Sequence, residues 1–133
     1  MQMFEFVGQV QNGARLPSME QAINATRATL STLAERLGAD EARHLGAQLP
    51  EGIGQYLGGA SREGERFSRD EFLQRVSERE GVDLPVSIQH ARAVLDTLNK
   101  AVSEGEMRDV LQRLPAEYAP LFAGTSGKLR PDR

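Results

Sequence analysis

The chain has no cysteine, which excludes disulfides, thiolate metal sites and cysteine nucleophiles together. It also has no apolar run long enough to cross a bilayer, so we expect no membrane association. The first residues, Met1 to Phe6, lack the basic and long apolar regions of a secretory signal, and this predicts a cytoplasmic location. Lysine is scarce as well, since Lys100 and Lys128 are the only two. These absences indicate a soluble protein that folds without disulfides.

The composition is that of one small globular protein. Of the 133 residues, 39% are hydrophobic and 26% are charged. The formal net charge of −3 lacks the basic excess that nucleic-acid binding usually needs, so we expect no nucleic-acid partner. Between residues 62 and 79 arginines and acids alternate, and mixed signs of this kind are typical of a solvated face.

The sequence repeats itself once. The segment from Ile23 to Pro50 aligns with the segment from Ile88 to Pro115, and Glu5-Phe6 aligns with Glu71-Phe72 after one residue is dropped. Identical pairs occur along the alignment: Ile23/Ile88, Arg27/Arg92, Ala28/Ala93, Leu30/Leu95, Thr32/Thr97, Leu33/Leu98, Glu41/Glu106, Leu49/Leu114 and Pro50/Pro115. Self-similarity of this kind predicts two structural repeats. A unit of roughly sixty residues buries only about 60% of its surface, so we expect the repeats to share an interface.

Apolar residues at alternating four- and three-residue steps predict a long helix in each repeat, from about Ser18 to Leu37 and from about Pro85 to Val102. Other helices or turns are expected at about 2–11, 40–48, 51–57, 69–80, 104–113 and 116–122. Capping-box patterns mark three helix starts: Ser18 with Gln21, Ser68 with Glu71, and Ser103 with Glu106. In this motif the hydroxyl and the side chain three residues later both accept hydrogen bonds from backbone N–H groups of the first turn.

The predicted fold is all-α: an internally duplicated helical bundle, in which two pseudo-symmetric repeats of three to four helices pack together. We expect repeat 1 at residues 1–58, a linker at 59–67, repeat 2 at 68–122 and a flexible tail at 123–133. The expected buried seam consists of Ile23, Leu30, Leu33, Ile88, Leu95 and Leu98.

A repeated combination of motifs resembles a known family. Each half has Glu-Phe in its first helix, a Leu-x-x-Leu long helix, and Gln-Leu-Pro (48–50) or Arg-Leu-Pro (113–115) followed by Tyr56-Leu57 or Leu121-Phe122. This pattern resembles the bacterial family catalogued as domain of unknown function 2267, over Phe4 to Phe122. The resemblance implies an all-helical, internally duplicated bacterial protein, and it implies no activity and no catalytic residues.

Four polar residues occupy matching positions in the two repeats and form a candidate metal site. Glu41 and His44 lie one helical turn apart, and their counterparts are Glu106 and Asp109. If the repeats pack about a pseudo-twofold axis, the four side chains converge into an oxygen-rich site with one nitrogen ligand, suited to Mn, Fe or Zn. The alternative, which we favour, is that Glu41 and Glu106 are ordinary first-turn acids, with His44 near the surface.

Arg27 and Arg92 form a second matched pair, each at the border of a buried face. Two guanidinium groups close to a symmetry axis would bind a small anionic ligand. The alternative, which we favour, is that they pair with acids on the adjacent helix, Glu41 and Glu106.

Apolar and aromatic side chains follow the two proline residues that end the shorter helices: Tyr56, Leu57, Tyr118, Leu121 and Phe122. These residues either close the bundle or form an exposed partner surface. Closure is favoured because the same ends recur in both halves.

The leading functional hypothesis is a non-catalytic interaction or adaptor module that binds a protein partner or itself. Packing and capping signals are abundant, whereas no nucleophile and base are paired; His90 corresponds to Ala25 in the other repeat and is interpreted as an ordinary residue. The alternative is a metal or small-anion binding protein, possibly an enzyme, that uses the matched acids and arginines. No cofactor is expected, and a divalent metal is the alternative.

Overall fold

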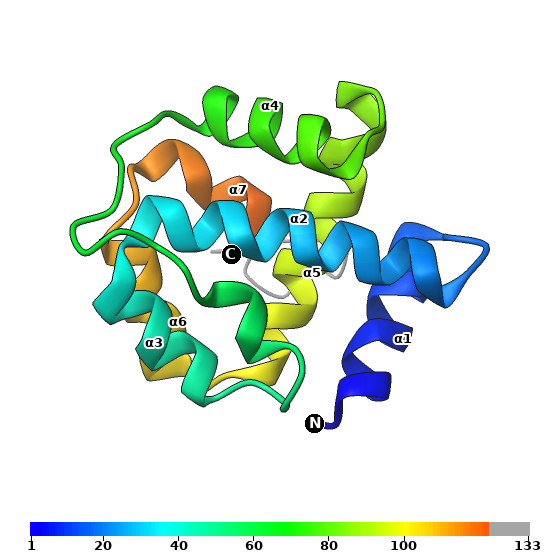
Figure 1. Cartoon of the computed structure of the whole chain (residues 1–133), viewed down its shortest axis with the longest axis horizontal. Coiled ribbons are helices and arrows are strands. Elements are labelled where there is room, and N and C mark those ends of the chain that lie inside the picture. Colours follow the sequence, from blue (N-terminus) through cyan, green and yellow to red (C-terminus); the bar gives the residue numbers. More distant parts are fainter. Residues whose placement is uncertain (123–133) are drawn as a thin grey trace, which may run out of the picture.

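The computed structural model describes residues 1–122, and every regular element in this range is helical (Figure 1). The elements are α1 (Met3–Ala14), α2 (Met19–Leu37), α3 (Ala39–Ala47), the 3-10 turn η1 (Gly54–Leu57), α4 (Arg69–Glu80), α5 (Leu84–Ala101), α6 (Glu104–Gln112), the 3-10 turn η2 (Ala116–Tyr118) and α7 (Ala119–Phe122). The all-α class is therefore confirmed. The expected flexible tail lies outside the described residues.

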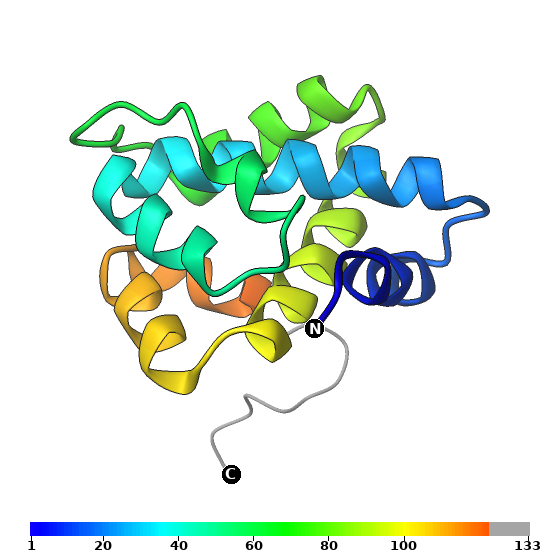
Figure 2. The same cartoon turned by 60° about the horizontal axis from the view of Figure 1, so that its bottom comes forward.

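The helices of the two halves interleave. Helix α1 contacts α5 as well as α2, and α4 contacts α2 as well as α5. The two long helices, α2 and α5, also contact each other, and α3 lies against α6 at one end of the molecule (Figures 1 and 2). Each first helix therefore bridges both long helices instead of packing within its own half alone.

A single apolar core lies between these helices. Leu30, Leu33, Leu95 and Leu98 are fully buried, as expected for the seam between the long helices. Ile23 and Ile88 are only partly buried and pack at its edge, so the expected seam was too long at these two positions.

The predicted helix starts at three serines are confirmed. The hydroxyls of Ser18, Ser68 and Ser103 each accept a hydrogen bond, 3.1 Å long, from the backbone N–H three residues later. The second half of the capping box, in which the serine N–H donates to the side chain three residues later, is absent at all three serines. At Ser103 the N–H donates to Gln48 Oε1 at 2.8 Å, and the carboxylate of Glu106 lies near that of Glu41 on α3.

The residues after the two prolines close the core. Tyr118 and Phe122 are fully buried, and Leu57 and Leu121 are nearly so, whereas Tyr56 is half-buried. The Tyr118 hydroxyl donates to Phe67 O at 2.7 Å, and burial raises the pKa of this phenol. Closure of the bundle, the favoured interpretation, therefore describes these residues, and the alternative of an exposed partner surface is wrong for all of them except the half-buried Tyr56.

The segment at 59–67 is held along the C-terminal end of α2. The N–H of Glu65 donates to Glu35 O, and the N–H of Ala39 donates to Ser61 O, both at 2.8 Å. Gly64 has a φ of +76°, and a Cβ there would lie 2.8 Å from Arg36 O. This close approach brings Glu65 beside α2 and α4.

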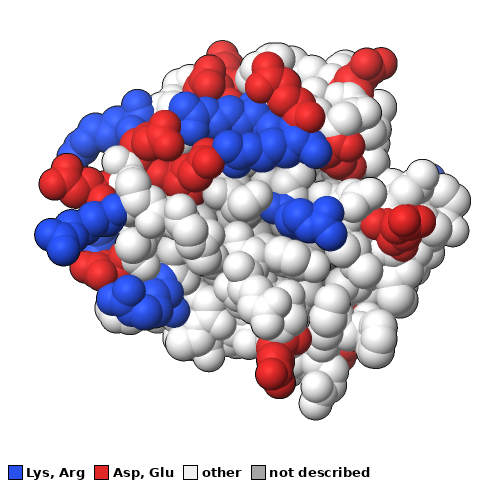
Figure 3. Space-filling model, in the orientation of Figure 1, with Lys and Arg blue, Asp and Glu red and all other residues white. Residues whose placement is uncertain are grey.

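Acidic and basic side chains alternate over α4 and the C-terminal part of α2 on the face shown in Figure 3. Among the described helices, none combines the length and the apolar character that a membrane crossing requires.

Candidate cation site

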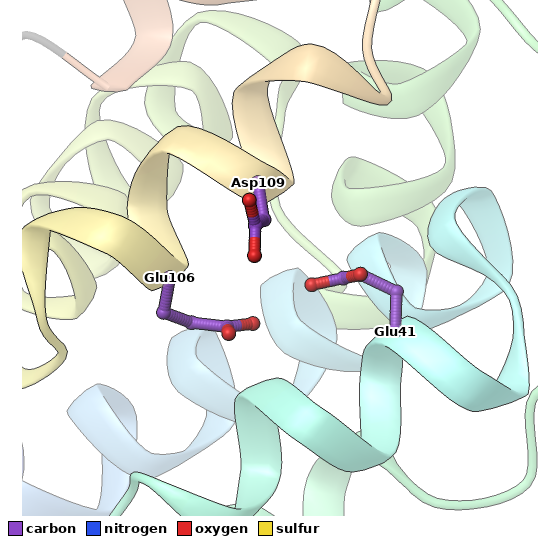
Figure 4. A group of neighbouring side chains, drawn as sticks. All are labelled: Glu41, Glu106 and Asp109. Carbon is purple, nitrogen blue, oxygen red and sulfur yellow. The ribbon is translucent and has the colours of Figure 1, made fainter.

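Three carboxylates converge where α3 meets α6 (Figure 4). Glu41 comes from α3, and Glu106 and Asp109 come from one face of α6, one turn apart. One oxygen atom of each carboxylate lies within 4.8 Å of the other two. Of the two interpretations of the sequence, the one that we did not favour, convergence, describes these three residues.

Two of these acids are buried with unused hydrogen-bonding capacity. Glu41 is 4% exposed and Glu106 is 8% exposed, while Asp109 lies at the surface. One oxygen of each buried acid, Glu41 Oε2 and Glu106 Oε2, has no hydrogen-bond partner. Leaving a buried polar group unsatisfied costs about 1 to 3 kcal/mol, and more when the group is charged. The cluster therefore favours binding of a proton or a cation.

Only one basic group contacts the cluster among the described residues. The Nε of Arg113 lies 2.8 Å from Glu41 Oε1, and the Arg113 side chain is 57% exposed. Three ionised carboxylates and one guanidinium leave two negative charges in excess.

Burial and the neighbouring negative charges together raise the pKa of Glu106. Burial raises the pKa of Glu106 from its usual 4.5 to about 7, with further contributions from Glu41 and Asp109. Arg113 opposes the shift. The cluster thus binds positive charge, as a proton, near neutral pH.

His44 does not join the cluster. Helix α3 turns Ala42 and Leu45 into the core, which leaves His44 exposed on its solvent side. The expected nitrogen ligand is therefore missing, and the donor set consists of oxygen atoms only. Such a set suits Mg²⁺, Ca²⁺ or Mn²⁺ instead of the Fe or Zn expected with a histidine.

Arg27 and Arg92 lie in separate surroundings. The Arg27 guanidinium lies 5.6 Å from the centre of the Tyr56 ring and donates to Asn24 Oδ1 at 3.1 Å. Arg92 is exposed and lines a hollow with Arg15 at the end of α1. The favoured pairing of these arginines with Glu41 and Glu106 is wrong, because Arg113 takes that position at Glu41.

The sequence analysis missed a network of ion pairs between α2 and α4. Glu35 accepts hydrogen bonds from Arg75 at 3.0 Å and from Arg79 at 2.7 Å, and Arg75 also pairs with Glu65 and Glu71. Burial by itself would raise the pKa of Glu35, but the two arginines outweigh it and lower the pKa below its usual value. The alternating charges that indicated a solvated face therefore join the two halves.

The comparison with protein families finds a family that covers nearly the whole chain. The family model described as "Uncharacterized conserved protein (DUF2267)" matches residues 4–121, which confirms the resemblance seen in the repeated motifs. No curated protein matches the chain.

Proposed function

Because this chain belongs to the DUF2267 family of uncharacterized conserved proteins, whose description assigns no activity, we propose its function from the site itself: a helical protein that binds a divalent cation between α3 and α6. The observation that carries the proposal is the pair of buried carboxylates, each with one unpartnered oxygen, within 4.8 Å of a third. A divalent ion would neutralise the two excess negative charges and satisfy both oxygens.

Binding of the ion would link the two halves of the protein. Helix α3 follows the first long helix and α6 follows the second, so one ion held by Glu41, Glu106 and Asp109 would tie the two halves together. We propose that the ion stabilises this end of the molecule and that no reaction takes place there. Asp109, at the surface, is placed to admit the ion.

We also propose that the two halves arose by duplication. Their helices have matching lengths, with 12 residues in α1 and α4, 19 and 18 in α2 and α5, and 9 in α3 and α6. Glu41 and Glu106 are each the third residue of their helix. A paired site of this kind follows naturally from a duplicated helix.

The test is to titrate chelator-stripped protein with MgCl₂, CaCl₂ and MnCl₂. Calorimetry measures binding of each ion, and thermal unfolding measures its effect on stability. At a free-ion concentration roughly 100 times the Kd, binding to the folded state should add about 2.7 kcal/mol to the free energy of unfolding. Glu106→Gln should abolish the response, and it should fold well because it removes a buried charge. The matched control is Glu104→Gln, an exposed acid in the first turn of the same helix.

The control decides between site binding and general screening. An equal response in Glu104→Gln and Glu106→Gln would show that the ions act on the overall charge, and no saturable response in the wild-type protein would overturn the proposal.

A second candidate function is binding of a protein partner or of a second copy. It is supported by large apolar side chains at the surface, of which Phe4 is 71% exposed and Val86 is 43% exposed. Native mass spectrometry over a range of concentrations tests self-association, and Phe4→Ser should weaken any dimer that is found.

A further inference from the structure

The α1–α2 loop lies at the opposite end of the molecule from α3 and α6 (Figure 1). A groove beside this loop is a second candidate binding site. It lies between the α1–α2 loop, α2 and the start of α5, and has a volume of about 470 Å³. Its walls are mostly apolar and include Leu16, Pro17, Val82 and Val86. Pockets of about 300 to 1,000 Å³ with apolar walls and a few polar groups are typical of small-molecule sites.

A buried histidine and a buried carboxylate also line this groove. His90 Nδ1 is hydrogen-bonded to Glu80 Oε2, and the two side chains are only 10% and 4% exposed. The second oxygen, Glu80 Oε1, is buried without a hydrogen-bond partner. This pair was not predicted from the sequence, because the two residues lie in different helices and the position of His90 is occupied by Ala25 in the first half.

The hydrogen bond to Glu80 determines what His90 offers to a ligand. We assign the tautomer in which Nδ1–H donates to the carboxylate and Nε2 carries no proton, so that Nε2 presents its lone pair as an acceptor. Nε2 has no hydrogen-bond partner among the described residues. A ligand that brings a hydrogen-bond donor into the groove would satisfy this atom.

The other residues that line the groove restrict which chemical groups a ligand can carry. Gln21 and Asn24, one turn apart on α2, contribute side-chain amides that donate hydrogen bonds. The carboxylate of Glu80 disfavours an anion, and a pure hydrocarbon would leave Nε2 unsatisfied. We propose that the groove binds a small apolar molecule with one neutral hydroxyl group, which donates to His90 Nε2 and accepts from an amide of α2.

Three probes of similar size test this proposal: phenol, toluene and benzoate, each titrated into ¹⁵N-labelled protein and followed by amide chemical shifts. Phenol should shift the signals of Val82 and Val86 in a saturable way, and toluene and benzoate should bind at least about tenfold more weakly, as the loss of one hydrogen bond of about 1.4 kcal/mol requires. Equal binding of the three probes would overturn the proposal. Tighter binding of benzylamine than of phenol would also overturn it, and would identify the groove as a site for cations.

Two variants separate the roles of the buried pair. His90→Phe should keep toluene binding and lose the preference for phenol, which shows that the groove is still folded. Glu80→Gln should keep phenol binding, since the new amide oxygen still accepts from Nδ1–H, and should relax the discrimination against benzoate. Unchanged discrimination in both variants would contradict the assigned roles. Glu106→Gln should bind phenol like the wild-type protein, so this test does not depend on the cation site.

Discussion

Two charged contacts join the halves of this protein, and they are built in opposite ways. Between α2 and α4, Glu35 lies against two guanidinium groups, and one of these, Arg75, has two further acidic partners. Between α3 and α6, the half-exposed guanidinium of Arg113 contacts Glu41, with Glu106 and Asp109 nearby. The first contact has three carboxylates for two guanidiniums, whereas the second has three carboxylates for one.

The difference is visible in two glutamates of the same chemical type. Arginine partners hold the pKa of Glu35 below its usual value, whereas burial and neighbouring acids raise the pKa of Glu106 to about 7. The excess of acid between α3 and α6 is the observation on which the proposed cation site rests.

The largest expected effect of this difference is on the pH dependence of stability. Because the pKa of Glu106 is higher in the folded protein than its usual 4.5, the folded state binds more protons than the unfolded state between pH 4.5 and about 7. The free energy of unfolding of metal-free protein should then fall as pH rises through this window, by up to about 1.4 kcal/mol per pH unit. Urea unfolding at a series of pH values measures this slope.

The groups that face Glu106 set the control for this measurement. The charged groups around it are Glu41 on α3, Asp109 on α6 and Arg113, which follows the last residue of α6. Glu106→Gln should remove the slope without changing these neighbours, and saturating MgCl₂ should flatten it in the wild-type protein. Parallel curves for wild type and Glu106→Gln would show that another group causes the dependence.

An intermediate effect on stability is expected when the ion pairs between α2 and α4 are broken. Glu35→Gln removes a carboxylate that is 28% exposed and accepts from Arg75 and Arg79, so it should cost about 1 to 2 kcal/mol near pH 7. Since the pKa of Glu35 is lowered in the folded state, this stabilisation is present above its unfolded pKa and is lost as the pH falls through the folded pKa. Chemical unfolding at pH 7 and pH 3 measures the loss. An equal cost for Glu78→Gln, an exposed acid of α4, would argue against a special role for Glu35.

Much of the fold could be predicted from local signals in the sequence. The serines that cap α2, α4 and α6 and the apolar stripe through Leu30 and Leu95 are local patterns, and the structure contains them. The ion pairs of Glu35 were not predictable, because its partners are 40 and 44 residues away and their charges alternate as on a solvated surface.

The candidate site was predictable only in part. The matching positions of Glu41 and Glu106 indicated that the acids meet, but the same pattern at Ser103 also fits a capping box that would have occupied Glu106. In the structure the Ser103 N–H donates to Gln48 Oε1 instead of to Glu106. Gln48 and Arg113 are the first residues of the two repeated tripeptides before the prolines, and both cross from one half to the other. These matching positions were interpreted only as helix ends, although they could have indicated contacts between the two halves.

The smallest expected effect comes from adding a second positive charge to the acidic cluster between α3 and α6. Asp109→Lys places an ammonium group at the surface beside Glu41 and Glu106, and should stabilise metal-free protein by about 0.5 kcal/mol while it removes the response to MgCl₂. Glu104→Lys makes the same change of charge on the same helix outside the cluster and should not be stabilising, because a cation is unfavourable near a helix N-terminus. Thermal unfolding of both variants with and without MgCl₂ measures the difference. If Asp109→Lys keeps the wild-type response to MgCl₂, the ion does not bind among these carboxylates, and the excess of acid is a feature of the fold alone.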